Sequence, residues 1–236
     1  MFHYRKAWQD VRARIENAAR AAGRPADTVR LLAVSKTFPP AAIRALHGLG
    51  QRAFGENYVQ EAAAKMDALT DLTDVEWHLI GPLQSNKTKA AAERFAWVHT
   101  VDRAKVAERL SAARPAGMPF LNVCIQVNIS GEASKSGVPP ADALALARSV
   151  ASLPRLAVRG LMGIAEATPV IATRRAQYRI LRVLLDQCRA AGLTVDTLSM
   201  GMSADLEDAI AEGATIVRVG TALFGARETA QAMPSV

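Results

Sequence analysis

Short β-rich segments alternate with alanine-rich helical segments along the whole chain, and this alternation limits the possible folds more than any other feature. Eight segments carry β-branched or large apolar residues, and most of them end at Gly, Asn, Asp or Ser. They span residues 30–35, 52–55, 76–80, 97–101, 121–128, 156–162, 197–200 and 215–219. Strict alternation implies a parallel sheet, because each helix returns the chain to the edge at which the previous strand began.

The segments between these strands carry helical signals. Helices are expected over residues 4–22, 43–46, 141–153, 172–191 and 203–212. Gly192 follows the fourth of them as a stop signal, and Ser203 is the expected N-cap of the last. The first of these helices precedes the first strand and is therefore additional to the βα alternation.

Eight βα units leave two architectures open, a closed barrel and a large doubly wound sheet. The length of 236 residues fits the barrel, for which about 250 residues are typical. No composition break, internal repeat or linker rich in Pro, Ser or Gly divides the chain. We therefore expect one domain over residues 1–236, a (β/α)₈ TIM barrel in the α/β class with an extra N-terminal helix.

Composition and local patterns argue against several classes of protein. Cys124 and Cys188 lie far apart in apolar stretches and form no CxxC pair, so we expect two reduced packing residues in a cytoplasmic protein. The first ten residues lack the apolar core of a signal peptide, and no run of about 18 apolar residues could span a membrane. The four histidines are far apart and show no metal-binding spacing.

The net charge of +7 could favour an anionic partner such as nucleic acid. However, the basic residues are scattered beside acidic ones, no basic run reaches five residues, and aromatic residues are few. Nucleic-acid binding is therefore not expected to be the main role.

The candidate site lies where the strands end, because barrels of this kind carry their active sites at the C-terminal ends of the strands. Lys36 follows the apolar residues 31–34 of the first strand. Burial at the barrel rim would lower the pKa of this lysine and favour the neutral amine that Schiff-base chemistry requires. The alternative is a lysine whose stem packs while its ammonium reaches water, and Lys36 taken alone favours this alternative.

Turns that contain glycine follow the last two strands. In this fold the loops after strands seven and eight often bind phosphate at a helix N-terminus, and Gly201 and Gly220 would let the backbone approach it closely. The hydroxyls of Ser199, Ser203 and Thr221 could donate to it. Ordinary βα turns with Ser or Thr caps are the alternative. An amine and a phosphate anchor on one barrel face match pyridoxal 5'-phosphate, which carries an aldehyde and a phosphate.

Several motifs in a fixed order resemble the pyridoxal phosphate homeostasis protein family, also called the pyridoxal phosphate-binding protein family. They lie at residues 33–36, 54–61, 77–87, 128–137, 160–162, 199–210 and 218–225, so the resemblance covers almost the whole chain. It implies the barrel of fold-type III pyridoxal phosphate enzymes, such as the N-terminal barrel of alanine racemase.

The resemblance also implies roles for individual residues. Lys36 would form the internal aldimine with the cofactor, and Arg218 would face its pyridine nitrogen. Ser199, Gly220 and Thr221 would help to hold the phosphate. The other positions that match the cofactor-binding motifs are Asn57, His78 and Met162, which would line the ring pocket, and Gly201 and Met202.

Two further points bear on activity. A cationic arginine at the ring nitrogen disfavours a proton there and weakens the ring as an electron sink. Fold-type III racemases also use an additional β-domain and a second acid–base residue. The chain ends about ten residues after Gly225, so we do not expect that domain. None of Tyr4, Tyr58 and Tyr178 is placed as the opposite base.

We therefore expect a monomeric protein that binds pyridoxal phosphate in vitamin B6 homeostasis, with apo-enzymes that accept the cofactor as its partners, and not a robust catalyst. An amino-acid racemase or related fold-type III enzyme is the alternative. A third hypothesis is a phosphosugar-type barrel enzyme, in which Lys36 would form a Schiff base with the substrate.

Overall fold

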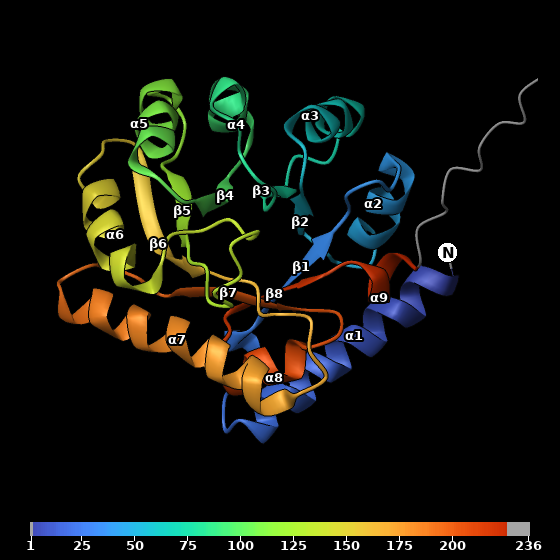
Figure 1. The fold of residues 1–236 in the computed structure, drawn as a ribbon. Helices are drawn as coiled ribbons and strands as arrows, with labels where there is room; N and C mark the ends of the chain where they lie inside the picture. Colours follow the sequence, from blue (N-terminus) through green and yellow to red (C-terminus); the bar gives the residue numbers. More distant parts are fainter. Residues whose placement is uncertain (1, 226–236) are drawn as a thin grey trace, which may run out of the picture.

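The computed structural model describes residues 2–225, which form a closed barrel of eight parallel strands (Figure 1). Each strand pairs with the next along the chain, and the last strand pairs with the first through residues 216–219 and 30–33. The strands are β1 (Arg30–Val34), β2 (Ala53–Glu56), β3 (Glu76–Leu79), β4 (Trp97–Val101), β5 (Leu121–Gln126), β6 (Leu156–Met162), β7 (Thr197–Met202) and β8 (Ile216–Val219). The expected (β/α)₈ barrel is confirmed.

Helices surround the barrel and bury their apolar faces against the outside of the strands. They are α1 (Phe2–Ala21), α2 (Pro40–His47), α3 (Val59–Ala68), α4 (Thr88–Arg94), α5 (Ala104–Ala113), α6 (Ala143–Ala151), α7 (Ile171–Ala190), α8 (Leu206–Ala211) and α9 (Thr221–Phe224), with short 3₁₀ turns at Ala26–Thr28, Ser85–Lys87 and Pro140–Asp142. In α7, for example, Tyr178, Leu181 and Leu185 recur at helical spacing and are buried.

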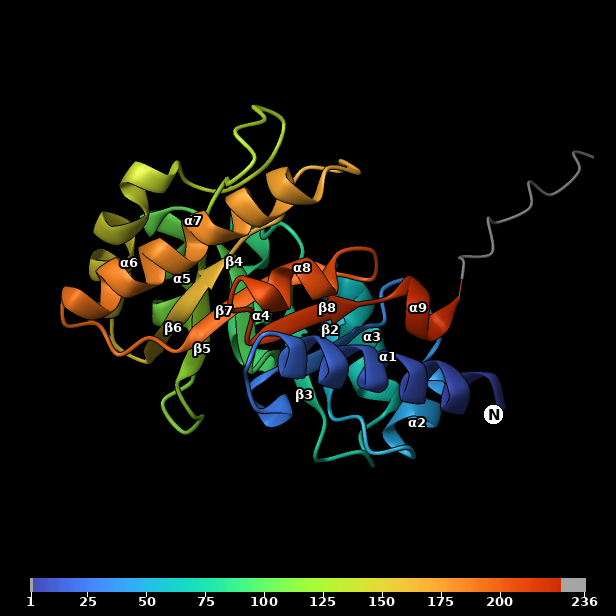
Figure 2. The same cartoon turned by 90° about the horizontal axis from the view of Figure 1, so that it is seen from below.

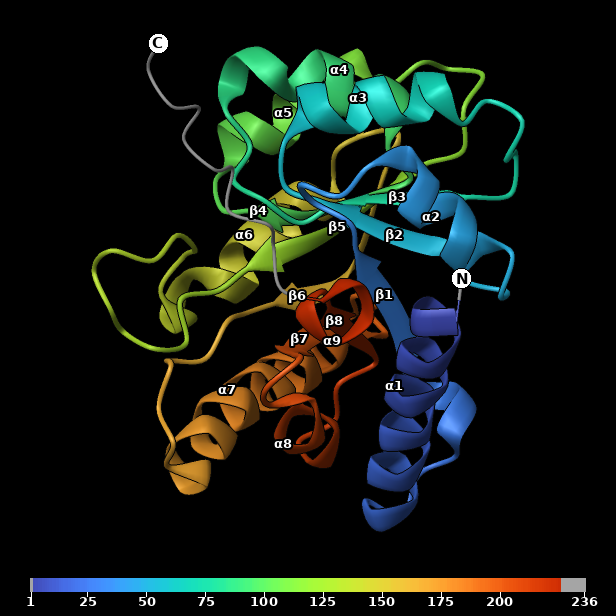
Figure 3. The ribbon, with the colours of Figure 1, turned by 90° about the vertical axis from the view of Figure 1, so that its right-hand side faces the viewer.

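The extra N-terminal helix is α1, and it packs through one stripe of residues. Val11, Ile15 and Ala19 are four residues apart and almost fully buried. The helix lies next to α2 on one side of the molecule (Figure 3) and next to α8 on the other (Figure 2). It therefore closes the outer layer between the first and the last βα units.

The strand and helix after residue 197 differ from the sequence prediction. Strand β7 continues to Met202 with a register irregularity against β8, so it ends two residues later than predicted. Helix α8 begins at Leu206, and Asp205 rather than Ser203 occupies the N-cap position. The predicted Ser203 N-cap is wrong, because the longer strand places Ser203 in the turn before the helix.

Three findings on the described residues concern membrane spans, metal binding and the two cysteines. Within residues 2–225 no helix is long and apolar enough to cross a membrane. In the same part of the chain, no group of three or more His, Cys, Asp or Glu side chains is arranged to hold a metal ion. Cys124 and Cys188 are both buried and free.

Candidate functional site

A cavity of about 320 Å³ opens at the C-terminal ends of the strands, between β1, β2, β7 and β8. Seven of the residues expected at the site line it, and these are Lys36, Asn57, Met202, Ser203, Arg218, Gly220 and Thr221. The cavity thus brings together the rim lysine of the first strand and the turn after the last strand. These two features lie almost 190 residues apart in the sequence but are adjacent because β8 pairs with β1.

The turn that carries Lys36 has an unusual backbone conformation. Thr37 has a φ of 69°, a left-handed conformation that is costly for a β-branched residue. Hydrogen bonds hold the turn on both sides of the lysine: Lys65 Nζ donates to the Ser35 carbonyl (2.8 Å), and Thr37 N donates to Glu61 Oε1 (2.5 Å). The position of Lys36 is therefore set by side chains from α3.

A buried group of charges lies behind this turn. Lys65 Nζ donates to Glu56 Oε1 (2.8 Å) and to Glu61 Oε1 (2.6 Å), and Ser35 Oγ also donates to Glu56 Oε1 (2.6 Å). Glu56 is fully buried, and this burial raises the pKa of its carboxyl group, although the hydrogen bonds from Lys65 and Ser35 oppose the shift. Glu56 Oε2 has no hydrogen-bond partner among the described residues.

Arg218 brings a buried positive charge to the cavity. Its Nη1 donates to the carbonyl (2.5 Å) and the hydroxyl (2.9 Å) of Ser199, and its Nη2 donates to the Gly163 carbonyl (3.0 Å). Burial lowers the pKa of this guanidinium. A guanidinium has five N–H groups, so at least two of those of Arg218 have no hydrogen-bond partner within residues 2–225. The side chain can therefore donate to an acceptor in the cavity.

Three of the expected residues lie inside the barrel and do not line the cavity. The Ser199 hydroxyl is fully buried and hydrogen-bonded to Arg218 and to His99. His78 is also fully buried and stacks on Trp97, with ring centroids 5.4 Å apart. Met162 packs in the same interior layer as Trp97. Ser199 falls short of the rim because β7 continues for three residues beyond it.

Gly201 and Gly220 both lie close to a neighbouring element, but only Gly220 lines the cavity. Gly201 has a φ of 89° and lies outside the cavity lining, where a Cβ atom would come within 2.5 Å of the Ala209 Cβ. It therefore lets α8 pack closely on the end of β7. Gly220 does line the cavity, and a Cβ there would lie 3.3 Å from the Val34 carbonyl oxygen.

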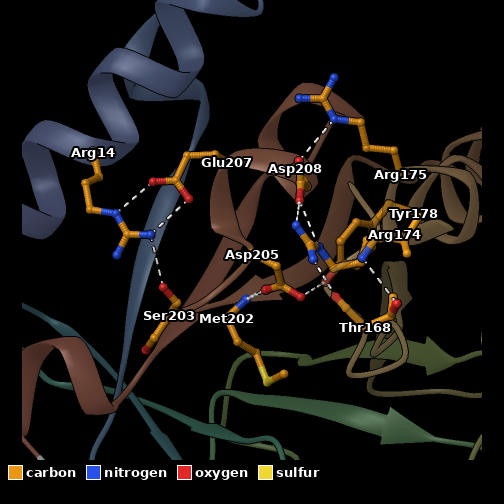
Figure 4. A network of polar contacts seen from close by, with 11 residues as sticks. Arg14, Thr168, Arg174, Arg175, Tyr178, Met202, Ser203, Asp205, Glu207 and Asp208 are labelled. Atoms are coloured by element: carbon orange, nitrogen blue, oxygen red, sulfur yellow. Dashed lines mark hydrogen bonds and ion pairs between the residues drawn. The ribbon is translucent and has the colours of Figure 1, made fainter. Parts of the chain in front are cut away.

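The β7–α8 turn, which forms one wall of the cavity, is tied to α1. Arg14 donates to both carboxylate oxygens of Glu207 (2.7 and 2.9 Å) and to the Ser203 carbonyl (3.0 Å), as Figure 4 shows. The Ser203 hydroxyl accepts from Ala222 N (3.5 Å), and Ser203 is part of the cavity lining. The additional N-terminal helix thus helps to position the candidate site.

Asp205 fixes the same turn from the barrel side. Its Oδ1 accepts from Met202 N (2.6 Å), and its Oδ2 accepts from the Tyr178 hydroxyl (2.7 Å), as drawn in Figure 4. Burial and the Asp205 charge together raise the pKa of Tyr178 well above its ordinary value. Tyr178 is therefore a neutral hydrogen-bond donor in the interior.

Sequence reasoning missed the apolar wall of the cavity and one buried histidine. Phe38 lines the cavity and stacks on Phe224 with centroids 4.8 Å apart, and Ile80 and Ile164 complete the wall. The sequence did offer a signal for Phe38, which is an aromatic residue in the loop only two residues after Lys36. His99 gave no such signal, because only the barrel closure brings β4 opposite β7.

Comparison with known proteins identifies the family. The chain matches the family model described as alanine racemase, N-terminal domain, over residues 8–228. The pyridoxal phosphate homeostasis protein of Pseudomonas aeruginosa is 61% identical over 218 residues, which cover 92% of this chain and 93% of that protein. The protein of the same name from Escherichia coli K12 is 50% identical over 220 residues, 92% of this chain and 94% of that protein.

Solved structures agree with this assignment. PipY of Synechococcus elongatus, determined with pyridoxal phosphate bound, superposes with a TM-score of 0.78 at 42% identity and covers 90% of this chain and 100% of that one. Alanine racemase of Clostridium difficile shares the fold alone, with a TM-score of 0.74 at 12% identity, and the match covers 98% of this chain and 58% of the racemase. The chain belongs to the pyridoxal phosphate homeostasis protein family and has the alanine racemase-like barrel.

Proposed function

We propose that this protein binds pyridoxal 5'-phosphate covalently through the ε-amine of Lys36 and acts in pyridoxal phosphate homeostasis. The observation that carries the proposal is the single cavity lined by Lys36, Arg218 and the Gly220–Thr221 turn. An amine, a guanidinium with N–H groups to spare, and a hydroxyl-bearing turn share one small volume there. Its relatives carry the same function in their names, and PipY was determined with the cofactor bound.

The lining suits each part of the cofactor. When bound, the cofactor supplies an electrophilic aldehyde carbon and an electron-withdrawing ring. The Lys36 amine provides the nucleophile, and the hydroxyls of Ser203 and Thr221 with the Gly220 backbone provide donors for a phosphate. Phe38 and the neighbouring isoleucines give the ring an apolar surface.

Arg218 supports binding without robust turnover. Its spare N–H groups can donate to the lone pair of a ring nitrogen in the cavity. A guanidinium at that position disfavours a second positive charge on the nitrogen, so the ring remains a weak electron sink. Arg218 therefore orients the ring and keeps its reactivity low.

The tyrosines also favour a binding protein over an amino-acid racemase. Tyr178 is buried and its hydroxyl donates a hydrogen bond to Asp205, so it is not available as a base in the cavity. Tyr58 is 59% exposed and does not line the cavity. Tyr4 packs edge-on against Phe224, with ring centroids 6.2 Å apart. In the part of the chain that the structure describes, no tyrosine lies opposite Lys36 in the lining.

We further propose that the protein acts in the cytoplasm as a monomer and passes the cofactor to apo-enzymes that accept it. The two buried free thiols suit a reducing compartment.

The test is covalent mapping of the cofactor. The protein is loaded with pyridoxal phosphate, reduced with borohydride, digested and analysed by mass spectrometry. The reduced adduct should lie on the Lys36 peptide, and Lys36→Ala should lose it there, whereas Lys89→Ala at an exposed lysine should not. An adduct on other lysines of the wild-type protein, with none on Lys36, would refute the proposal. Sustained racemisation of an amino acid that is lost in Lys36→Ala would favour the racemase instead.

A further inference from the structure

A continuous chain of hydrogen bonds crosses the barrel interior from the cavity to the opposite end of the strands. Arg218 Nη1 donates to Ser199 Oγ (2.9 Å), which lies 2.8 Å from His99 Nδ1. His99 Nε2 lies 2.9 Å from His78 Nδ1, and His78 Nε2 lies 2.6 Å from Glu76 Oε1. Because β4 and β7 are not neighbours in the sheet, the contact between His99 and Ser199 must pass through the barrel lumen.

The Glu76 end of this chain reaches solvent. Glu76 is the first residue of β3, and its side chain is 32% exposed. Arg30, the first residue of β1, lies 2.6 Å from its Oε1 and borders a solvent-open hollow beside α1. Burial opposes ionisation of Glu76, but the hydrogen bond from His78 and the charge of Arg30 outweigh it and lower the pKa of Glu76 to about 2. Glu76 is therefore an acceptor at neutral pH.

The charge state of Glu76 fixes the direction of every hydrogen bond in the chain. Burial lowers the pKa of both His78 and His99, so each is neutral and has one donor and one acceptor nitrogen. His78 must donate from Nε2 to Glu76, which leaves its Nδ1 to accept from His99 Nε2. His99 Nδ1 then accepts a hydrogen bond from the Ser199 hydroxyl, and the Ser199 oxygen accepts one from Arg218.

The reverse arrangement would disturb Arg218. If His78 and His99 carried their protons on Nδ1, His99 would donate to Ser199 Oγ. The Ser199 oxygen would then accept from both His99 and Arg218 through its two lone pairs, and its own hydrogen would have no acceptor among the described residues. A buried hydroxyl hydrogen without an acceptor is costly in the low dielectric of the interior, and a hydroxyl that does not donate is a weaker acceptor for Arg218.

We propose that Glu76, His78 and His99 are positioning residues for the cofactor site. They set the Ser199 hydroxyl as an acceptor for Arg218 from a carboxylate at the far end of the barrel, and so hold the spare N–H groups of the guanidinium towards the cavity. This inference rests on the proposed function and adds to it a control point remote from the cofactor. None of the three residues lines the cavity.

The first test reads the histidine tautomers in the protein without cofactor. Imidazole ¹⁵N NMR of labelled protein should show Nε2–H and an unprotonated Nδ1 for both His78 and His99. In Glu76→Ala, and in Glu76→Ser as a second variant, a population with Nδ1–H should appear at both rings. Glu76→Gln should keep the wild-type tautomers, because Arg30 favours the amide oxygen at the position next to His78.

Asp74→Ala is the matched control. Asp74 lies at the same end of the barrel, is 54% exposed and pairs with His47 and Arg52, but it is not part of the chain. Its removal should leave both tautomers unchanged. A wild-type pattern at His99 in Glu76→Ala and Glu76→Ser, or an equal change in Asp74→Ala, would overturn the inference.

The second test measures the effect on binding. A weaker hydrogen bond from Arg218 to Ser199 should reduce pyridoxal phosphate affinity about threefold in Glu76→Ala, with a shift in the visible absorption of the loaded protein. Glu76→Gln should show wild-type affinity and absorption. A change of tautomer with unaltered affinity and spectrum would overturn the link to Arg218. Wild-type protein that bound no pyridoxal phosphate would refute the proposed function, whereas the tautomers of the unloaded protein would still decide whether Glu76 sets the chain.

Discussion

The buried charges behind the Lys36 turn allow a prediction with a defined size. Lys65→Met keeps the apolar stem of the lysine and removes the ammonium that hydrogen-bonds to Glu56, Glu61 and the Ser35 carbonyl. Glu56 is fully buried, so the variant leaves its carboxylate in the interior without that cation. Removing one partner of a buried ion pair typically costs about 3–5 kcal/mol of unfolding free energy, and we expect a loss in this range at pH 8.

The loss should depend on pH in a direction that the burial of Glu56 fixes. Its pKa in the folded protein is raised, mainly by burial, and Lys65 opposes that rise. Without Lys65 the folded-state pKa climbs further above the ordinary value of 4.5. A group with a raised folded-state pKa stabilises the folded protein while it is protonated, and that stability is lost as pH rises through the folded-state value. Lys65→Met should therefore be less damaging at pH 5.5 than at pH 8.

Urea unfolding followed by far-ultraviolet circular dichroism at the two pH values measures this effect. The double variant Glu56→Gln/Lys65→Met carries a neutral amide in place of the stranded carboxylate and should recover about half of the loss at pH 8. Lys89→Met is the control, because Lys89 is highly exposed, its nitrogen lies 3.9 Å from Glu93, and such a pair contributes less than about 1 kcal/mol.

Two results would refute this reasoning. An equal loss for Lys65→Met at pH 5.5 and pH 8 would mean that the Glu56 carboxylate is not the source of the cost. A double variant no more stable than Lys65→Met would lead to the same conclusion. The variant should also give less of the reduced Lys36 adduct, since the turn that presents Lys36 loses one of its two ties to α3.

Three smaller effects follow from other contacts. Glu76→Gln should lose less stability in acid than the wild type. The depressed pKa of Glu76 contributes roughly 1–2 kcal/mol of unfolding free energy above pH 4.5, and this contribution disappears as pH falls towards 2. Acid titration followed by circular dichroism measures the difference. Gly201→Ala should cost about 2–4 kcal/mol in urea unfolding, and adding Ala209→Gly should remove the steric part while the cost of the positive φ persists. Tyr178→Phe should cost about 1–2 kcal/mol in the same assay, since Asp205 loses a buried donor.

The fold was predictable because it depends on a local pattern repeated eight times. Each β-rich segment is short and apolar enough to be recognised alone, and the right fold follows from their number and alternation. The strand ends were less predictable. β7 runs on to Met202 through Gly201, whose positive φ and contact with α8 belong to tertiary packing that no local pattern encodes.

The cavity was predictable where its residues follow a strand directly. Lys36, Asn57 and Thr221 come just after β1, β2 and β8, and residues in these positions must reach the C-terminal rim of a barrel. Ser199 and His78 could not be placed in this way. They lie within strands, and whether such a residue reaches the rim or the lumen depends on the stagger of the closed sheet.

The two polar networks hold the two ends of the proposed cofactor site from behind. The Glu56–Lys65–Glu61 group fixes the turn that carries Lys36, and the chain from Glu76 to Ser199 holds Arg218. Buried polar groups of this kind can often be replaced by apolar side chains of similar shape without loss of stability, so their presence is weak evidence for a role in stability. They do reduce the freedom of the two side chains that must meet one rigid ligand, and restricting that freedom beforehand strengthens binding. The two polar networks are therefore better explained by the proposed cofactor site than by the fold.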